Sequence, residues 1–169
     1  MGKGKFDVEA IIRQAVEAGR MAEAKGSKDV YKSTEKRLYS YPVLKKKLED
    51  DKERLQEFLK LGPRGRSRSI VRYQKSGVRL TAEEIYEAVK LDMEATIAAD
   101  EEEISTIERA ISQIESDKFT LALTGKYFCG MSDEEIGAEI GCDATTVWRN
   151  RKRLMQIVMT YLYGVLAVH

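Results

Sequence analysis

The sequence predicts an all-α fold in which long helices, paired as a hairpin or a coiled coil, precede a C-terminal helix-turn-helix domain. Three observations lead to this fold class. The 169-residue chain has only two prolines, so long elements can run without interruption. Charged residues make up 34% of the chain, which suits long solvated helices better than a compact β-fold. Two segments carry heptad-spaced apolar seams, which are typical of helices that pack along their length.

Residues 1–61 are predicted to form an N-terminal helical region. Its first helix is expected over residues 7–25, where apolar residues recur on one helical face behind an Asp7 N-cap. A second helix is expected from about residue 29, with a kink or a restart at Pro42. The seam of this helix contains one acidic position, Asp51, and otherwise consists of Leu44, Leu48, Leu55 and Phe58.

Residues 62–80 are predicted to form a basic linker between the first helices and the rest of the chain. Up to Arg79 the segment carries six positive charges and no negative one, and glycine, proline and serine punctuate it. Such composition favours a loop over a regular element.

Residues 81–116 are predicted to form one long acidic helix. Thr81 is its expected N-cap, and Glu84 three residues later completes a capping box. Asp100 interrupts an otherwise apolar seam of Ile97, Ile104, Ile107, Ile111 and Ile114. Two seamed helices joined by a loop indicate either an antiparallel hairpin or an intermolecular coiled coil, and periodicity does not distinguish these.

The net charge of +1 conceals a strong asymmetry along the chain. Residues 1–80 contain 21 Lys and Arg against 11 Asp and Glu, whereas residues 81–117 contain 2 against 12. One interpretation is a nucleic-acid surface beside an acidic surface for a protein partner. The alternative is that basic and acidic helices pack beside each other.

Residues 117–169 are predicted to form the helix-turn-helix domain. A helix over residues 117–130 is expected to stop at Gly130, and Ser132 with Glu135 forms a second capping box for the next helix. Gly137 leaves room for another helix to approach closely. Gly141 can adopt the positive φ that a tight helix-to-helix turn requires.

A final helix is expected to begin after an Asp143 N-cap, with Val147 and Leu154 on its inner face. Hydroxyl and guanidinium groups suit base edges and phosphates, so the outward candidates for DNA contact are Thr145, Thr146, Arg149 and Trp148. Basic residues that could clamp the phosphate backbone follow within one turn: Arg151, Lys152 and Arg153.

Three questions about this DNA interface stay open. The two helices could be an ordinary helical hairpin with solvated basic residues, and Trp148 could pack on the domain instead of contacting DNA. The basic linker could add a second DNA contact or could be a solvated connection; the residues concerned are Arg64, Arg66, Arg68 and Arg72.

The segment from Tyr127 to Leu154 resembles the C-terminal helix-turn-helix of sigma-70-type factors, which reads promoter DNA. The wider layout is similar to phage ArpU/RinA-type late-transcription regulators, through residues 31–44, the acidic helix and Tyr163-Gly164. Gly137 and Cys142 depart from the alanine and valine usual in that family. The resemblance implies activation of phage or prophage late genes, with DNA contacts from Thr145, Thr146, Arg149 and Lys152.

Nothing in the sequence indicates an enzyme, a metal or a cofactor. The single histidine is His169, and no Gly-rich phosphate loop, Cys/His cluster or Ser/His/Asp set is visible. No run of eighteen apolar residues indicates a membrane span. The separated cysteines, Cys129 and Cys142, fit a reducing cytoplasm.

Three functions are therefore weighed. The first is a transcription regulator that binds double-stranded DNA and engages RNA polymerase or a second copy of itself. The second is a phage small-terminase-like DNA packaging or assembly protein, which also joins a helix-turn-helix to an oligomerising helical region. The third is a protein–protein adaptor that uses the fold without DNA.

Overall fold

The structure is a computed structural model that describes residues 14–15, 18–19, 30–63 and 81–164. Within these residues the chain forms helices and no strands, which confirms the predicted all-α class with long helices. The helix expected over residues 7–25 lies mostly outside them. In chain order the helices are α2 (Val30–Leu61), α3 (Ala82–Ser112), α4 (Thr120–Phe128), α5 (Asp133–Ile140) and α6 (Ala144–Tyr163).

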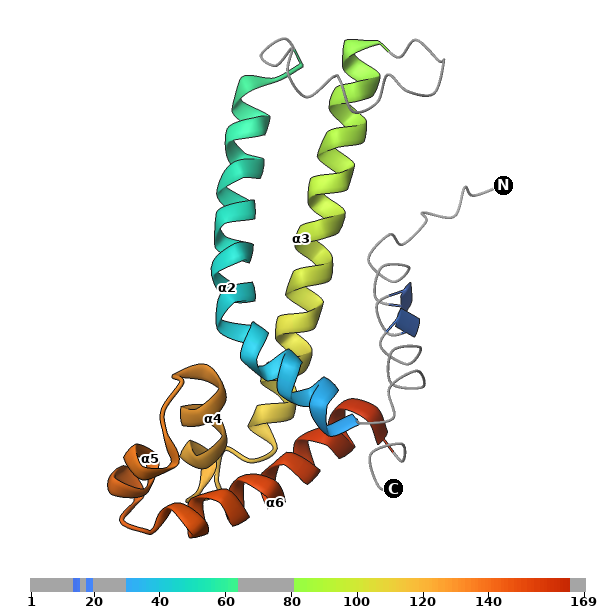
Figure 1. Cartoon of the computed structure of the whole chain (residues 1–169). Coiled ribbons are helices and arrows are strands. Elements are labelled where there is room, and N and C mark those ends of the chain that lie inside the picture. Colours follow the sequence, from blue (N-terminus) through green and yellow to red (C-terminus); the bar gives the residue numbers. More distant parts are fainter. Residues whose placement is uncertain (1–13, 16–17, 20–29, 64–80, 165–169) are drawn as a thin grey trace.

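The two long helices α2 and α3 lie side by side as an antiparallel hairpin within one chain (Figure 1). Of the two arrangements that the apolar seams allowed, the structure has the hairpin. Near the far end of the hairpin, Phe58 stacks on Tyr86 with ring centroids 4.6 Å apart. The α3 capping box forms as expected, with the Glu84 amide donating to the Thr81 hydroxyl and the Thr81 amide donating to Glu84.

Pro42 lies inside α2, and the helix continues through it. Figure 1 shows α2 changing direction in its blue part, close to the C-terminal helices. Proline has no N–H to donate to the preceding turn, and its ring crowds a backbone carbonyl, so a bend at this position has a direct cause. The helix therefore does not restart at Pro42, and the change of direction in Figure 1 agrees with the predicted kink.

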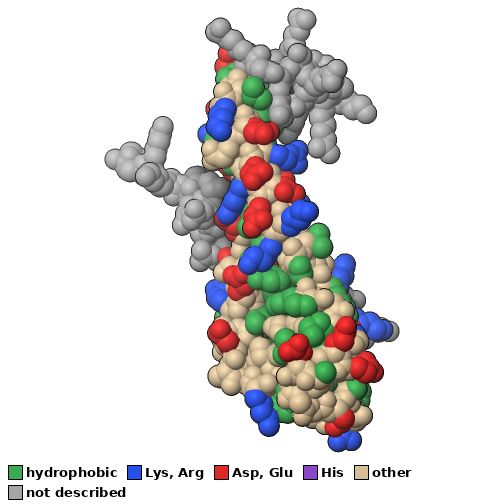
Figure 2. Space-filling model, turned by 90° about the vertical axis from the view of Figure 1, so that its left-hand side faces the viewer, with side chains coloured by type: hydrophobic (Ala, Val, Ile, Leu, Met, Phe, Trp, Pro, Cys, Tyr) green, Lys and Arg blue, Asp and Glu red, His purple; other side chains and the backbone are tan. Residues whose placement is uncertain are grey.

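Ion pairs connect the basic helix α2 to the acidic helix α3. Arg37 contacts Glu103 at 2.7 Å, and Lys52 contacts Glu101 at 2.6 Å. Figure 2 shows blue and red side chains next to one another along the shaft of the hairpin. Part of the charge asymmetry of the sequence therefore comes from a basic and an acidic helix that pack beside each other. This is the second of the two interpretations given above.

The acidic interruptions of the two seams meet at one cation. The ammonium of Lys47 on α2 lies 2.8 Å from Asp51 on the same helix and also pairs with Asp100 on α3. Both carboxylates are mostly buried, with side-chain exposures of 17% and 18%. A shared lysine thus allows each seam to hold a carboxylate at the helix interface.

Replacing Lys47 by methionine should lower the free energy of unfolding by less than about 1 kcal/mol, because the lysine is half exposed and water screens its pairs. Urea unfolding measures this change, and the mutational effect should shrink in high salt. The matched control is Lys60→Met, which removes the same charge from an exposed position in the last turn of α2. A loss above twice that limit would show that water does not screen the pairs that Lys47 makes.

One apolar core is shared by four helices. It joins α2, α3, α4 and α6 through residues that include Leu38, Ile107, Leu123, Leu154, Met155 and Val158. A smaller cluster, made of Ala122, Ile136 and Val147, holds α4, α5 and the first turns of α6 together. The C-terminal helices are therefore packed directly on the base of the hairpin.

Candidate nucleic-acid interface

Helices α5 and α6 are joined by a tight turn whose local geometry matches the sequence prediction. Ser132 and Glu135 form both hydrogen bonds of a capping box at the start of α5. Gly141 ends that helix with φ 78° and ψ 41°, a left-handed conformation that glycine adopts without a steric penalty. Asp143 caps α6 by accepting a hydrogen bond from the Thr146 amide at 2.9 Å.

Gly137 permits the turn to close on itself. The backbone amides of Gly141 and Cys142 both donate to the Gly137 carbonyl, at 2.8 and 2.9 Å. A Cβ atom on Gly137 would lie 2.5 Å from the backbone oxygen of Cys142. The close approach that the sequence predicted at this glycine is therefore made by the turn's own backbone, not by another helix.

The inner faces of α5 and α6 are fixed against α4. Ile136 and Val147 are fully buried in the small cluster around Ala122, and Cys142 packs against it while partly exposed. Leu154 is also fully buried, as its inner-face position predicted. This packing sets which side of α6 faces solvent.

The outward face of α6 carries four of the predicted contact residues. Thr145, Trp148, Arg149 and Lys152 are all exposed. The Lys152 ammonium lies 4.3 Å from the centroid of the Trp148 ring, and the ring itself is 44% exposed. Trp148 therefore lies outside the buried core of the domain. Arg149 has no ion-pair partner among the residues that the structure describes.

Thr146 has a structural role beside any contact that it makes. It is partly buried, and its hydroxyl donates to the Asp143 carboxylate at 2.7 Å. The hydroxyl and amide of Thr146 together hold the pKa of Asp143 below its usual value. The N-terminus of α6 therefore carries a carboxylate at its cap, and this negative charge repels a phosphate. An anion would bind to the following turns of the helix instead.

Arg151 was predicted to contact the phosphate backbone, and the structure contradicts this. The residue is only 8% exposed, and its guanidinium makes a bidentate ion pair with Asp133, with Nη2 and Oδ2 2.9 Å apart. The hydrogen bond from Arg151 holds the pKa of Asp133 below its usual value. Arg151 thus fastens α6 to the first turn of α5 and takes no part in the outward face.

Arg153 lies at the edge of that face. Its side chain is half exposed, and it donates to Asp117 at 2.8 Å and to Asn150 at 3.2 Å. Asn150 is partly buried, and its side-chain amide donates to the Thr146 carbonyl at 3.0 Å. The sequence did not indicate Asp117 and Asp133 as the ion-pair partners of Arg153 and Arg151. The linker candidates lie outside the described residues: Arg64, Arg66, Arg68 and Arg72.

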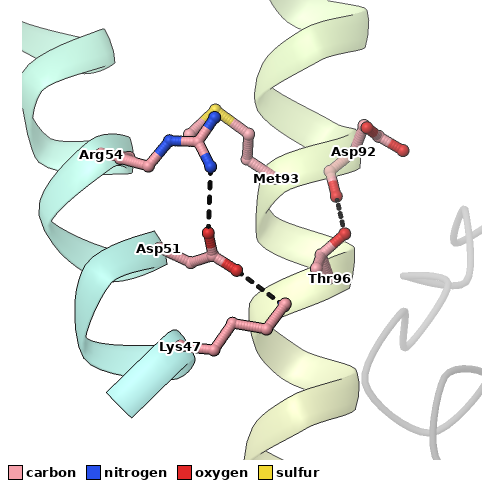
Figure 3. A pocket seen from close by; sticks show the side chains of 6 residues that line it. All are labelled: Lys47, Asp51, Arg54, Asp92, Met93 and Thr96. Carbon is pink, nitrogen blue, oxygen red and sulfur yellow. Dashed lines mark hydrogen bonds and ion pairs between the residues drawn. The ribbon is translucent and has the colours of Figure 1, made fainter. Parts of the chain in front are cut away.

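A second surface feature, an open pocket between α2 and α3, offers a poorer site (Figure 3). Asp51 accepts from both Lys47 and Arg54, so the charges in it neutralise one another. Its α3 wall consists of Asp92, Met93 and Thr96, and the Thr96 hydroxyl is bonded to the Asp92 carbonyl. The lining carries two cations and two carboxylates, so the pocket has no net charge to select a ligand.

The described residues contain neither a membrane-spanning helix nor a cluster of metal ligands. None of the helices in that part of the chain is long and apolar enough to cross a membrane. The same residues contain no group of three or more His, Cys, Asp or Glu side chains arranged to hold a metal ion. No family model matches the sequence, and comparisons with curated proteins and with solved structures likewise give no match.

Proposed function

We propose that this protein is a sequence-specific regulator of transcription that binds double-stranded DNA through α6. The observation that carries the proposal is the division of that helix into two faces. Val147, Arg151 and Leu154 hold it to the protein, whereas Thr145, Arg149 and Lys152 point away. An α-helix with such an outward face fits the major groove, where guanidinium groups bind guanine edges and ammonium groups bind phosphate.

The resemblance to sigma-like phage regulators narrows the proposal further. By that resemblance the protein acts in the cytoplasm as an activator of phage or prophage late genes, with RNA polymerase as its protein partner. The hairpin of α2 and α3 extends away from α4, α5 and α6 (Figure 1) and is the candidate contact for that partner. A second copy of the chain is the other candidate.

Genome-wide footprinting of the purified full-length protein tests the proposal. A discrete set of protected sites upstream of genes would support it, and binding should weaken steeply with salt because phosphate contacts release counterions. The absence of protection at low salt on any duplex would overturn it and favour the adaptor. Light scattering on the same sample addresses the packaging alternative, since a ring of many subunits would favour that function.

The variants Arg149→Ala and Lys152→Ala should weaken DNA binding in different ways. Loss of Arg149 should cost about 1–3 kcal/mol on the best site and relax the base preference there, because a guanidinium reads base edges. Loss of Lys152 should weaken all sequences alike and lower the salt slope by about 1, because an ammonium binds phosphate. Fluorescence anisotropy with specific and scrambled duplexes separates the two effects.

Lys60→Ala is the matched control for both variants, since it removes one positive charge at an exposed position in the last turn of α2. Its affinity should stay within a factor of two or so of the unmodified protein, as expected for a charge that makes no DNA contact. Unchanged binding in all three variants would show that α6 is not the DNA-contacting helix.

A further inference from the structure

Trp148 is the only tryptophan of the chain, and it lies among polar side chains on the outward face of α6. Its neighbour Val147 is fully buried, whereas 44% of the Trp148 surface is open to solvent. Burying an aromatic side chain stabilises a fold through its large apolar area, so a tryptophan that stays 44% exposed contributes only part of that energy to folding. Its exposed surface is available to a binding partner.

The ring is held in place by a charge one turn further along. Lys152 lies four residues after Trp148, the spacing at which helix side chains meet, and its ammonium sits 4.3 Å from the ring centroid. A cation over an aromatic face is attracted by the ring quadrupole. This contact occupies one face of the indole and restricts its rotamers, while 44% of the residue's surface stays exposed.

The polarity of the neighbouring side chains limits what the free part of the ring can recognise. Thr145 and Arg149 flank Trp148 with a hydroxyl and a guanidinium, both suited to polar partners. The indole is thus the apolar element in the N-terminal turns of this face. In the major groove the bases present hydrogen-bonding atoms together with one apolar group, the C5-methyl of thymine.

We propose that Trp148 recognises the C5-methyl group of a thymine in the DNA target. The inference rests on the proposed function, because it requires α6 in the major groove. It adds a base identity to the site: a thymine beside the base pair that Arg149 reads. Recognition depends on the apolar burial of one methyl group, so it discriminates thymine from cytosine. It also discriminates thymine from uracil, which forms the same Watson–Crick pair with adenine.

Scanning the footprinted duplex with deoxyuridine tests this contact, since each replacement removes one methyl and leaves pairing intact. At one position within the footprint, affinity for the full-length protein should fall about four-fold, the value for one buried methyl group. The same replacement should have no effect on Trp148→Ala, while the other positions behave as in the unmodified protein. Trp148→Phe should retain part of the sensitivity.

Emission from Trp148 provides a readout that does not depend on the scan. Because it is the sole tryptophan, saturating the protein with the specific duplex should change its fluorescence, and the deoxyuridine duplex should change it less. Glu139→Ala, at an exposed position on α5, is the control for substitution near the interface. Circular dichroism establishes that the Trp148 variants stay folded.

The outcomes separate the two proposals. A discrete footprint together with a flat deoxyuridine scan, or with unchanged Trp148 emission, would overturn the thymine contact and leave the regulator in place. A methyl dependence that persists in Trp148→Ala would assign the contact to another side chain and equally overturn the inference. If no duplex binds specifically, both proposals fail together.

Discussion

Replacing Arg151 by alanine should lower the free energy of unfolding by about 2–4 kcal/mol, because it leaves the Asp133 carboxylate without its partner at a mostly buried site. The lower part of the range known for buried pairs applies, since the Asp133 side chain keeps 22% of its surface exposed. Urea unfolding followed by circular dichroism measures the loss. Arg109→Ala is the control: it breaks the more exposed pair with Glu102 and should cost less than about 1 kcal/mol.

The pH dependence of stability gives a check on the same pair. Because the folded protein holds the pKa of Asp133 below its usual value, the pair contributes its stability above the ordinary carboxyl pKa. That contribution is lost as the pH falls through the folded pKa, below about 4. Arg151→Ala should therefore lose less stability between pH 6 and pH 3 than the unmodified protein. The difference should be up to about 1 kcal/mol, because pH 3 lies only about one unit below the ordinary carboxyl pKa. Parallel acid profiles for the two proteins would contradict this.

The double variant Arg151→Met with Asp133→Leu separates a stabilising role from a positioning one. Two apolar side chains fill the site without leaving a charge, so much of the stability lost in Arg151→Ala should return. If the double variant binds DNA as tightly as the unmodified protein, the ion pair serves only the fold. If affinity stays low while stability recovers, the pair sets the angle between α5 and α6.

Gly137→Ala should destabilise the fold by about 1–3 kcal/mol, the usual cost of forcing an extra carbon into a packed site. The added Cβ would meet the Cys142 carbonyl at 2.5 Å, and this oxygen belongs to the backbone of a hydrogen-bonded turn that cannot rotate away. Alanine favours a helix over glycine by up to about 1 kcal/mol, which offsets only part of the clash.

The second expected effect of Gly137→Ala is on DNA binding. The turn must open to relieve the contact, and this shifts the start of α6 relative to α5. The affinity for DNA should therefore fall more than ten-fold. A ten-fold loss corresponds to about 1.4 kcal/mol of binding free energy. Anisotropy and urea unfolding on the same sample measure both effects. Ala138→Gly, at the exposed neighbouring position, removes helix propensity without a clash and should leave affinity unchanged. A more stable Gly137→Ala protein would show that the turn relaxes freely.

Much of the local structure could be predicted because it is encoded within a few residues. The caps at Thr81, Ser132 and Asp143 and the left-handed Gly141 each depend on one turn of chain, and all four are confirmed. The pairing of α2 with α3 was left open, because an apolar seam specifies that a helix packs but not on which partner. The shared lysine at Lys47 depends on that pairing and could not be foreseen.

The error at Arg151 had a signal that went unused. Arg151 lies four residues after Val147 and three before Leu154, so helical periodicity places it on the inner face that those residues define. Counting basic residues in a run led to Arg151, Lys152 and Arg153 being grouped, although successive residues on a helix point in different directions. The outward positions of Thr145 and Arg149 could be predicted from their place near the start of the helix, whereas Lys152 was predicted from the basic run and from the resemblance.

The length of α6 gives the molecule a mechanical property. Its 20 residues span about 30 Å; the first turns rest on α4 and α5, while the later ones are embedded at the foot of the hairpin through Met155, Val158 and Leu162. One rod therefore belongs to both halves of the protein, and a close-packed interior transmits strain instead of absorbing it. We therefore expect a displacement of the far tip of α2 and α3 to change the orientation of α6.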